Sequence, residues 1–295
     1  MSTEKTVLIT GATGFIGSNL SKLLVSLDFD VHIIVRRSSN LEILDQLIPN
    51  ITVHHHNGST AGMRSIIKKV QPDCVFHLAS LFLVKHSSKD VIPLVKSNIL
   101  FGTQLLDAMA EFNVLRLINA STSWVHFGQA IYDPVCLYAA TKMAFEDILV
   151  YYNNGKMISS ISLELFDTYG PNDPRHKLFY ALKNASQSTI PVKMSPGDQL
   201  IDLVYIDDVM DAFLTASKLI SKVKSNPKYM VTSGNLVTLK EIVNLYEEIN
   251  NHRINVEWGG LPYREREVMI PWQIGETLPD WSPKIDLRKG ISMIS

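Results

Sequence analysis

A glycine-rich turn near the N-terminus constrains the fold of this chain more than any other feature. The apolar run Thr6–Thr10 leads into Gly11-Ala-Thr-Gly-Phe-Ile-Gly17, which opens directly into an amphipathic stretch. A strand, a tight glycine turn and a helix in this order begin a βαβ unit, and the helix start attracts an anion. Although such a turn can also serve only as a connection, we expect it to bind the diphosphate of a dinucleotide. The residues expected to do so are Gly11, Thr13, Gly14, Phe15, Ile16 and Gly17.

The rest of the first half repeats this alternation of short β-branched runs and amphipathic stretches. Strands are predicted at 6–10, 31–35, 51–55, 74–78, 115–120 and 158–165, and helices at 15–26, 62–70, 95–112 and 138–152. This order is typical of a parallel sheet covered by helices. The sequence therefore predicts an α/β fold with a doubly wound, Rossmann-like parallel sheet, whose ligands bind beyond the carboxyl ends of the strands.

The pattern changes after residue 165. A loop at 167–176 is rich in Gly, Pro, Asn and Asp, and the later segments no longer alternate strictly. Helices are predicted at 207–219 and 239–250, and strands at 229–232 and 254–258. We expect residues 1–165 to form a dinucleotide-binding domain to which 202–234 return. We expect 166–201 and 235–295 to form a smaller, discontinuous α/β region that binds the substrate.

Charge, length and cysteine content exclude several classes of protein. The 295 residues include 28 Lys and Arg against 29 Asp and Glu, so no overall field favours nucleic acid or an anionic membrane. No apolar run approaches the roughly 20 residues of a membrane span, and the first residues lack a signal-peptide pattern. Cys74 and Cys136 lack the spacing of a disulfide framework. We expect a cytoplasmic protein that binds neither nucleic acid nor a membrane.

Three consecutive histidines, His54 to His56, are the feature that most suggests a metal. Successive residues of a strand point to opposite faces, and no cluster of Cys or carboxylates accompanies these three. We therefore expect no metal site.

The predicted second strand ends in Arg36 and Arg37, where an NAD site usually has an acidic residue for the adenosine ribose. No carboxylate occurs before Glu42. A guanidinium at this place can pair with a 2′-phosphate. NADP(H) is therefore the expected cofactor, although two solvated loop arginines would give the same pattern.

Tyr138 and Lys142 lie four residues apart, which puts the phenol and the ammonium on one face of a predicted helix. A neighbouring cation favours the phenolate and brings a tyrosine closer to acid–base duty at neutral pH. This spacing also occurs by chance, but the fifth predicted strand runs into hydroxyl residues where a substrate carbonyl would lie. We expect Tyr138, Lys142 and Thr122 to be catalytic, with Ser123 as the alternative to Thr122. A hydroxyl here can also only cap the turn.

Taken together, these motifs resemble the extended short-chain dehydrogenases/reductases, the NAD-dependent epimerase/dehydratase family that acts on sugar nucleotides. The resemblance covers nearly the whole chain. It includes His77-Leu-Ala-Ser80, Asn98 with Gly102-Thr-Gln-Leu-Leu106, Tyr169-Gly-Pro171, the segment 202–208 and Trp281-Ser-Pro283. Segments 137–147 and 163–171 look most similar to reductases of nucleotide-linked 4-keto-6-deoxysugars, such as CDP-abequose and CDP-paratose synthases.

This resemblance implies an activity and an assembly. NADPH would reduce C4 of a 4-keto-6-deoxysugar while Tyr138 protonates the alkoxide, a step in bacterial surface polysaccharide (O-antigen, lipopolysaccharide) synthesis. Helices 95–112 and 138–152 resemble the pair that forms a dimer interface in relatives, so a homodimer is expected. Beside Tyr138 and Lys142, the further residues implied at the cofactor are Asn57, Gly58, Leu78, Ala79, Ser80, Asn98 and Leu165.

The chain departs from the family pattern at positions that narrow the reaction. Ser123 and Trp124 follow Thr122 where 4,6-dehydratases have an Asp-Glu pair, which disfavours a dehydratase. Three other departures concern binding: Asn57-Gly58 replaces the usual Asp-Ile or Asp-Leu near adenine, Asp167 replaces a nucleotide-binding Asn, and Ile201 replaces a common Arg.

A sugar nucleotide carries a diphosphate, which requires local cations in a chain of net charge −1. Arg264 occupies the position where relatives have a diphosphate-binding arginine, and Lys177 is the second candidate. The alternating charges around Arg264 also suit a solvated loop. An apolar wall for the deoxysugar methyl group is expected from side chains that could equally be plain packing. The full set expected at the substrate is Leu81, Phe82, Trp124, Asp167, Thr168, Lys177, Phe179 and Arg264.

Two alternative functions remain at this point. One is a sugar-nucleotide epimerase that holds its NAD tightly, which Arg36 and Arg37 disfavour. The other is a non-catalytic NADP-binding sensor, which the presence of Tyr138, Lys142 and Thr122 together disfavours.

Overall fold

Seven parallel strands form the central sheet, in the order β10-β6-β5-β4-β1-β2-β3. The computed structural model of the chain describes residues 5–156, 158–223 and 225–294. The order reverses between β1 and β4, which creates a crevice at the carboxyl ends of the strands. The expected doubly wound fold is therefore confirmed. The strands are β1 (Thr6–Thr10), β2 (Asp30–Arg36), β3 (Ile51–His56), β4 (Cys74–His77), β5 (Arg116–Thr122), β6 (Ser159–Leu165) and β10 (Lys228–Val231).

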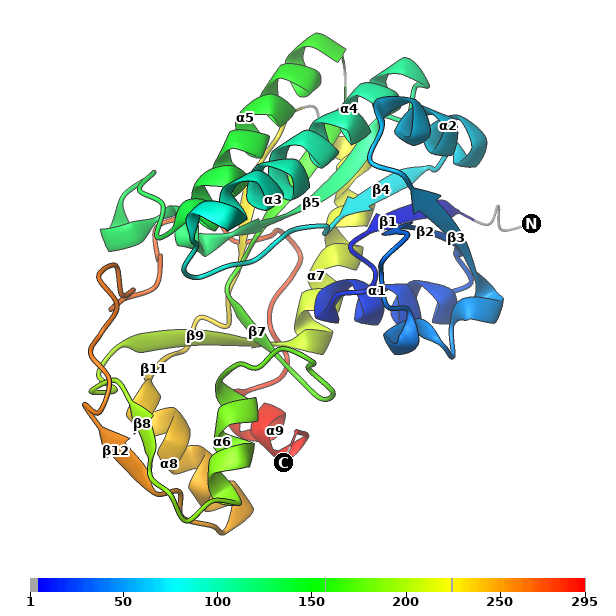
Figure 1. Cartoon of the computed structure of the whole chain (residues 1–295). Helices are drawn as coiled ribbons and strands as arrows, with labels where there is room; N and C mark the ends of the chain where they lie inside the picture. The colour runs from blue at the N-terminus through cyan, green and yellow to red at the C-terminus, as the bar shows by residue number, and fades with distance from the viewer. Residues whose placement is uncertain (1–4, 157, 224, 295) are drawn as a thin grey trace.

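Helices cover both faces of this sheet, as Figure 1 shows. Helices α2 (Thr60–Val70), α4 (Phe101–Glu111) and α5 (Leu137–Lys156) lie on one face, and α1 (Phe15–Ser26) and α7 (Ile206–Leu219) lie on the other. In β1, Val7 and Ile9 are buried in the core beneath α1 and α7, whereas Leu8 is buried in the core beneath the other helices. Because both faces are covered, the three central residues of β1, Val7 to Ile9, are all apolar and buried.

The helix expected at 95–112 begins earlier and is irregular, so that prediction of its start was wrong. It comprises α3 (Val91–Val95), the π-helical turn η4 (Lys96–Leu100) and α4. Pro93 lies in the first turn, where the missing N–H has no helical partner to lose. The π turn places the buried Asn98 under the loop that follows β4.

A smaller region lies beyond the carboxyl ends of the strands, at the lower left of Figure 1. Its strands β7 (Asp167–Tyr169), β9 (Leu200–Tyr205) and β11 (Leu236–Thr238) form one sheet, and β8 (Val192–Met194) pairs with β12 (Val256–Trp258). Its helices are α6 (Leu178–Ser186), α8 (Leu239–Asn250) and α9 (Leu287–Ser292). Short 3-10 turns complete the chain: η1 (Glu42–Leu44), η2 (Ile48–Asn50), η3 (Ser88–Asp90), η5 (Ser123–Val125), η6 (Phe127–Gln129) and η7 (Ile220–Lys222).

The strand expected at 254–258 is shorter and begins at Val256. The backbone N–H of Ile254 donates to the Glu247 carboxylate at 2.7 Å instead of entering a ladder. Within the described ranges, no helix is long and apolar enough to cross a membrane.

Two of the three histidines of β3, His54 and His56, have ordinary protein partners. His54 and His56 are buried and His55 is exposed. His54 Nε2 lies 2.8 Å from His32 Nδ1, and burial together with His32 lowers the pKa of His54 to about 4. His56 Nε2 donates to the Ser59 carbonyl at 3.1 Å. Among the residues that the structure describes, no group of three or more potential metal ligands is found.

Candidate active site

The glycine turn packs so closely that two of its glycines tolerate no side chain. Gly11 has φ 75°, and a Cβ there would lie 2.6 Å from the Ala79 backbone nitrogen. A Cβ on Gly17 would lie 2.2 Å from the Gly11 carbonyl oxygen. Gly14 begins α1 without a side-chain cap, so the N-terminal N–H groups of the helix face the crevice without a competing side-chain acceptor. The turn therefore fits a dinucleotide diphosphate, with Thr13 and Ile16 partly exposed beside it.

Arg36 and Arg37 stand exposed at the end of β2. Neither forms an ion pair within the described part of the chain. Both guanidinium groups are therefore available to a phosphate. Asn57 behaves differently, because its Oδ1 accepts hydrogen bonds from the N–H and the hydroxyl of Ser59, at 3.0 and 2.7 Å. Its side chain thus builds the turn before α2, next to the exposed Gly58.

Asn98 fixes the loop that follows β4. Its Oδ1 accepts from the Leu81 N–H at 2.7 Å, and its Nδ2 donates to the Leu81 carbonyl at 3.1 Å and to the Thr141 hydroxyl at 2.9 Å. The amide of Asn98 is thereby used within the protein, where it joins Leu81 of the loop to Thr141 of α5. The Ala79 N–H donates to the Thr10 hydroxyl, at 3.1 Å.

Tyr138 and Lys142 lie on the buried face of α5, one helical turn apart. Burial raises the pKa of Tyr138 to about 12, although hydrogen bonds from the Ser80 and Thr122 hydroxyls lower it. Burial lowers the pKa of Lys142 to about 8, and the charge of Glu146 raises it again. In the protein without ligands, the phenol therefore carries its proton at neutral pH, and the lysine loses its charge at a pH far below the usual one.

The sequence reasoning missed Glu146, which lies one turn beyond Lys142. The residue is 1% exposed, and its carboxylate accepts hydrogen bonds from Asn119 Nδ2 at 2.7 Å and from the Ser162 hydroxyl at 2.8 Å. No cation lies within ion-pair distance of it among the described residues. The spacing of four from Lys142 was the signal that could have revealed it.

The two candidate hydroxyls after β5 lie in different surroundings. Thr122 reaches the Tyr138 phenol, and its Oγ1 also accepts from the Trp124 N–H at 3.3 Å. Ser123 lines a separate cavity of about 110 Å³. Leu165 pairs with Thr122 in the sheet, which places it at the same carboxyl edge.

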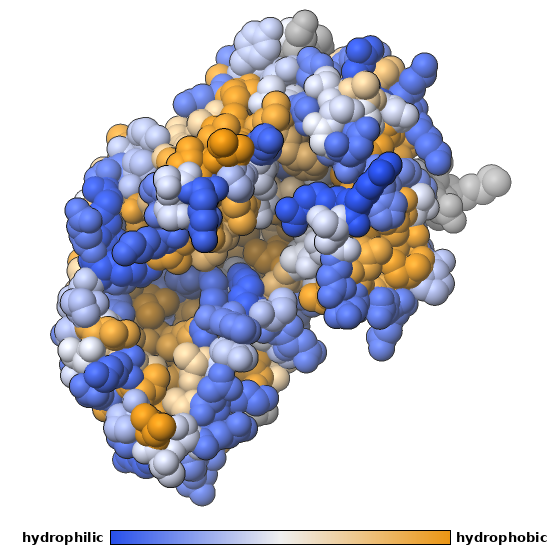
Figure 2. All heavy atoms as spheres, in the orientation of Figure 1, coloured by the Kyte–Doolittle hydropathy of each residue, from blue (hydrophilic) through white to orange (hydrophobic). Residues whose placement is uncertain are grey.

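A cavity of about 520 Å³ opens beside this group. Figure 2 shows the surface hollowed between the central sheet and the smaller region. The predicted substrate residue Leu81 does not line the cavity; it packs instead in a small core with Leu94 and Val125. The other predicted substrate residues all line it: Phe82, Trp124, Asp167, Thr168, Lys177, Phe179 and Arg264.

Each of two cations in the cavity combines an aromatic face with a carboxylate. Lys177 Nζ lies 3.2 Å from an Asp167 oxygen and 5.5 Å from the centre of the Phe82 ring. Arg264 Nε donates to Glu267 at 2.8 Å, and its guanidinium carbon lies 5.6 Å from the centre of the Trp124 ring.

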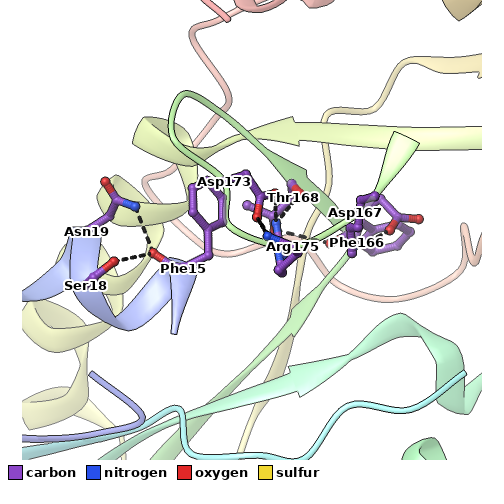
Figure 3. A network of polar contacts seen from close by, with 9 residues as sticks. Phe15, Ser18, Asn19, Phe166, Asp167, Thr168, Asp173 and Arg175 are labelled. Atoms are coloured by element: carbon purple, nitrogen blue, oxygen red, sulfur yellow. Dashed lines mark hydrogen bonds and ion pairs between the residues drawn. The ribbon is translucent and has the colours of Figure 1, made fainter. Parts of the chain in front are cut away.

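This arrangement raises the pKa of Arg264, chiefly through hydrogen bonding to Glu267. The sequence reasoning missed Glu267, although the i, i+3 spacing of an arginine and a glutamate could have suggested the pair. It also missed Arg175, which lines the cavity and lies over Phe15 (Figure 3).

Comparison with known proteins places the chain in one family. The model of the NAD dependent epimerase/dehydratase family matches residues 7–231. The chain is 27% identical to CDP-abequose synthase of Yersinia pseudotuberculosis, over 90% of this chain and 91% of that protein. It is 24% identical to UDP-glucuronate 4-epimerase of Thermodesulfobacterium geofontis, over 96% and 93%.

Solved structures share the fold over the same length. UDP-glucuronic acid 4-epimerase of Bacillus cereus, in complex with UDP-glucuronic acid and NAD, matches with a TM-score of 0.86 at 22% identity, over 98% of this chain and 97% of that one. UDP-glucose 4-epimerase of Thermotoga maritima, with UDP-glucose, matches with a TM-score of 0.83 at 23% identity, over 98% and 96%. The protein therefore belongs to the NAD dependent epimerase/dehydratase family of extended short-chain dehydrogenases, and it is an enzyme similar to CDP-abequose synthases.

Proposed function

We propose that this enzyme uses NADPH to reduce the C4 keto group of a nucleotide-linked 4-keto-6-deoxysugar. The observation that carries the proposal is the contact of Tyr138, which reaches the Thr122 hydroxyl, with Phe82, whose ring lines a cavity with aromatic walls. The reaction belongs to bacterial surface polysaccharide synthesis and takes place in the cytoplasm, where activated sugars and NADPH occur together.

The residues present fit a dinucleotide and a proton transfer. When bound on the glycine turn, NADPH supplies a hydride to the carbonyl carbon. The Thr122 hydroxyl donates a hydrogen bond to the carbonyl oxygen, and Tyr138 gives its phenolic proton to the same oxygen, so that the ketone becomes an alcohol. Tyr138 is left as a phenolate, which the cationic form of Lys142 stabilises until solvent returns the proton.

NADP is favoured over NAD by the end of β2. Arg36 and Arg37 are exposed there without ion pairs in the described structure, and the next carboxylate in the sequence is Glu42. A 2′-phosphate carries the negative charge that this pair can bind, whereas a ribose diol would find no carboxylate to accept its hydroxyls.

The cavity suits the diphosphate and the methyl group of the proposed substrate. Lys177 and Arg264 supply two cations, each already held in place by an aromatic ring. Phe82 and Trp124 lie in contact, with ring centres 5.5 Å apart, and supply an apolar wall near Tyr138 for C6. An aromatic wall accepts a methyl group without leaving a polar group unpaired.

A 4-epimerase is the second candidate, because the curated relatives include a UDP-glucuronate 4-epimerase beside the CDP-abequose synthases. NADPH oxidation should be followed with CDP-, dTDP- and GDP-linked 4-keto-6-deoxysugars, with NADH in parallel. Stoichiometric NADPH consumption supports the reductase. Conversion of a sugar nucleotide without net consumption identifies an epimerase, and cofactor binding without any turnover identifies a sensor.

We also propose that the enzyme is a homodimer. Large apolar side chains are exposed on α3 and α5, and Figure 2 shows hydrophobic residues gathered over these helices. Exposed apolar side chains along a helix pair are typical of an interface. They are Val91, Ile92 and Val95 of α3, beside the start of α5, and Val150 and Tyr151 near the end of α5. Light scattering would measure the mass in solution, and a monomer would contradict this proposal.

A further inference from the structure

The loop between β7 and α6 touches both expected ligand sites. Most of residues 170–177 line the large cavity that we assign to the nucleotide sugar. Arg175 of the same loop lies on the ring of Phe15, the first residue of α1 and part of the glycine turn (Figure 3). One short segment thus contacts the substrate cavity on one side and the dinucleotide turn on the other.

Four hydrogen bonds hold Arg175 in place. Its Nε and Nη2 donate to the two oxygens of Asp173, at 2.7 and 2.6 Å, and its backbone N–H donates to the same carboxylate at 3.0 Å. Its Nη2 also donates to the Thr168 carbonyl of β7, at 2.8 Å. The guanidinium carbon lies 4.6 Å from the centre of the Phe15 ring. Because these hydrogen bonds fix the planar guanidinium group, its cation–π contact with the Phe15 ring has a fixed orientation.

Phe15 is held by the smaller region from a second direction. Phe15 as a whole is 3% exposed. A Cβ on Gly170 would lie 3.3 Å from the end of the Phe15 ring and 2.4 Å from an Ile206 methyl group, so the loop approaches the ring closely at its start as well. Movement of the loop would therefore release the ring, and with it the first turn of α1.

We propose that Arg175 is a positioning residue that couples the two ligands of this enzyme. A nucleoside diphosphate that orders the loop 170–177 would hold Phe15, and through it the glycine turn, in the geometry that binds the dinucleotide. The inference rests on the proposed function in that it takes the cavity and the turn to be the two ligand sites. By thermodynamic linkage, each ligand must then tighten the binding of the other by the same factor.

The contact with Phe15 separates this role from that of Lys177 and Arg264. The rings beside those two cations, Phe82 and Trp124, belong to the cavity wall, whereas Phe15 belongs to the glycine turn. Lys177 and Arg264, the two cations placed at the diphosphate, remain in place when Arg175 is replaced. Loss of Arg175 should therefore reduce the coupling more than it reduces the affinity for nucleoside diphosphate alone.

The test measures the Kd of NADPH by its fluorescence, with and without saturating nucleoside diphosphate. CDP, UDP and dTDP are tried separately, and the one that binds most tightly is used. In the parent enzyme the Kd should fall about fivefold or more, the lower end of ordinary coupling. In Arg175→Ala the ratio should fall to less than about twofold, and the reciprocal titration should give the same value.

Three further variants sharpen the result. Arg175→Lys keeps the charge without the planar fork and should give an intermediate ratio. Phe15→Leu keeps a buried apolar side chain but removes the aromatic ring that contacts Arg175. This variant should therefore lose the coupling, as Arg175→Ala does. Arg288→Ala is the control for loss of an arginine paired with a carboxylate, because Nη2 of Arg288 donates to both oxygens of Glu248 at an exposed site, and it should keep the parent ratio.

The outcomes distinguish this inference from the proposed function. If both ligands bind the parent without coupling, or if Arg175→Ala and Phe15→Leu keep the parent ratio, the coupling role is wrong while the reductase proposal stands. If neither NADPH nor any nucleoside diphosphate binds the parent, the proposed function fails and takes the inference with it. Circular dichroism of each variant verifies that it is folded.

Discussion

The ring of Phe82 stands edge-on to the ring of Tyr138, with the ring centres 4.9 Å apart and the planes at 81°. Phe82 is 42% exposed and lines the large cavity, so a substrate that reaches the Tyr138 phenol must pass this ring. Phe82, an apolar part of the cavity wall, and Tyr138, the proposed acid, are thus neighbours. The C6 methyl group of the sugar is expected to lie on Phe82.

Replacing Phe82 should therefore change the choice of substrate. Phe82→Ser should lower kcat/KM for a 6-deoxysugar about tenfold relative to its 6-hydroxy analogue, because one methyl group in an apolar pocket is worth about 1–3 kcal/mol. Phe82→Leu, which stays apolar, is the control and should keep the parent preference. An unchanged ratio in Phe82→Ser would place the C6 group elsewhere.

Tyr138→Phe should lower kcat by about 10² to 10⁴, the usual contribution of a positioned acid, with little change in the Kd of NADPH. The ring that contacts Phe82 is kept, so a loss of activity reports the hydroxyl alone. Single-turnover NADPH oxidation measures the effect. Conversion as fast as in the parent enzyme would refute the assignment of the acid.

The pH dependence should follow Lys142. Its pKa of about 8 in the unliganded protein means that the cation is present below this pH and is lost as the pH rises through it. We expect kcat/KM to fall with the same midpoint, because the phenolate is then no longer stabilised.

Glu146→Gln tests the origin of this pKa. The negative charge of Glu146 raises the pKa of Lys142, so removal of this charge should shift the fall of kcat/KM at alkaline pH to a lower pH. In Lys142→Arg, the residual kcat/KM should not fall near pH 8, because a guanidinium keeps its charge. If the fall of kcat/KM keeps its midpoint in Glu146→Gln, a group other than Lys142 causes it.

Cofactor preference should depend on the end of β2. Arg36→Ala and Arg37→Ala should each raise the KM for NADPH by about tenfold or more, since a hydrogen bond to a charged group is worth about 1.5–3 kcal/mol. The KM for NADH should change little. Arg253→Ala, at a 91% exposed side chain of the smaller region, controls for the loss of a positive charge. Equal changes in the KM for NADPH and the KM for NADH would show that Arg36 and Arg37 do not bind the 2′-phosphate.

Stability should be sensitive at Gly17. A Cβ there would lie 2.2 Å from the Gly11 carbonyl oxygen and 2.8 Å from the Ala12 Cα, and backbone atoms cannot move aside as a side chain can. Gly17→Ala should therefore lower the free energy of unfolding by about 1–3 kcal/mol. Gly155→Ala is the matched control in α5, because its Cβ would meet only the edge of Tyr151 at 3.9 Å. Urea unfolding of both variants decides the matter, and an equally stable Gly17→Ala would contradict the packing.

Features that depend on neighbouring residues could be predicted from the sequence. The bounds of α1 and α8 agree with the prediction, because a glycine turn starts the first helix and the Thr238–Glu241 capping box starts the second. The approach of Tyr138 and Lys142 follows from helical spacing alone. The expected cavity wall of Phe82 and Trp124 depended on the family resemblance, which carries information about distant contacts that periodicity lacks.

Only the tertiary structure decided which distant residues meet. Helix α6 and strands β7, β8, β9 and β11 were not predicted. The three-residue strands β7, β8 and β11 carry little periodicity, and β9 takes its hydrogen-bond partners from the remote segments β7 and β11. Leu81 and Phe82 are both apolar, and the sequence could not tell that the first packs inward and the second lines the cavity. The contact of Arg175 with Phe15 joins residues 160 positions apart. No local pattern encodes such a pair, because it exists only once two independently formed elements have packed together.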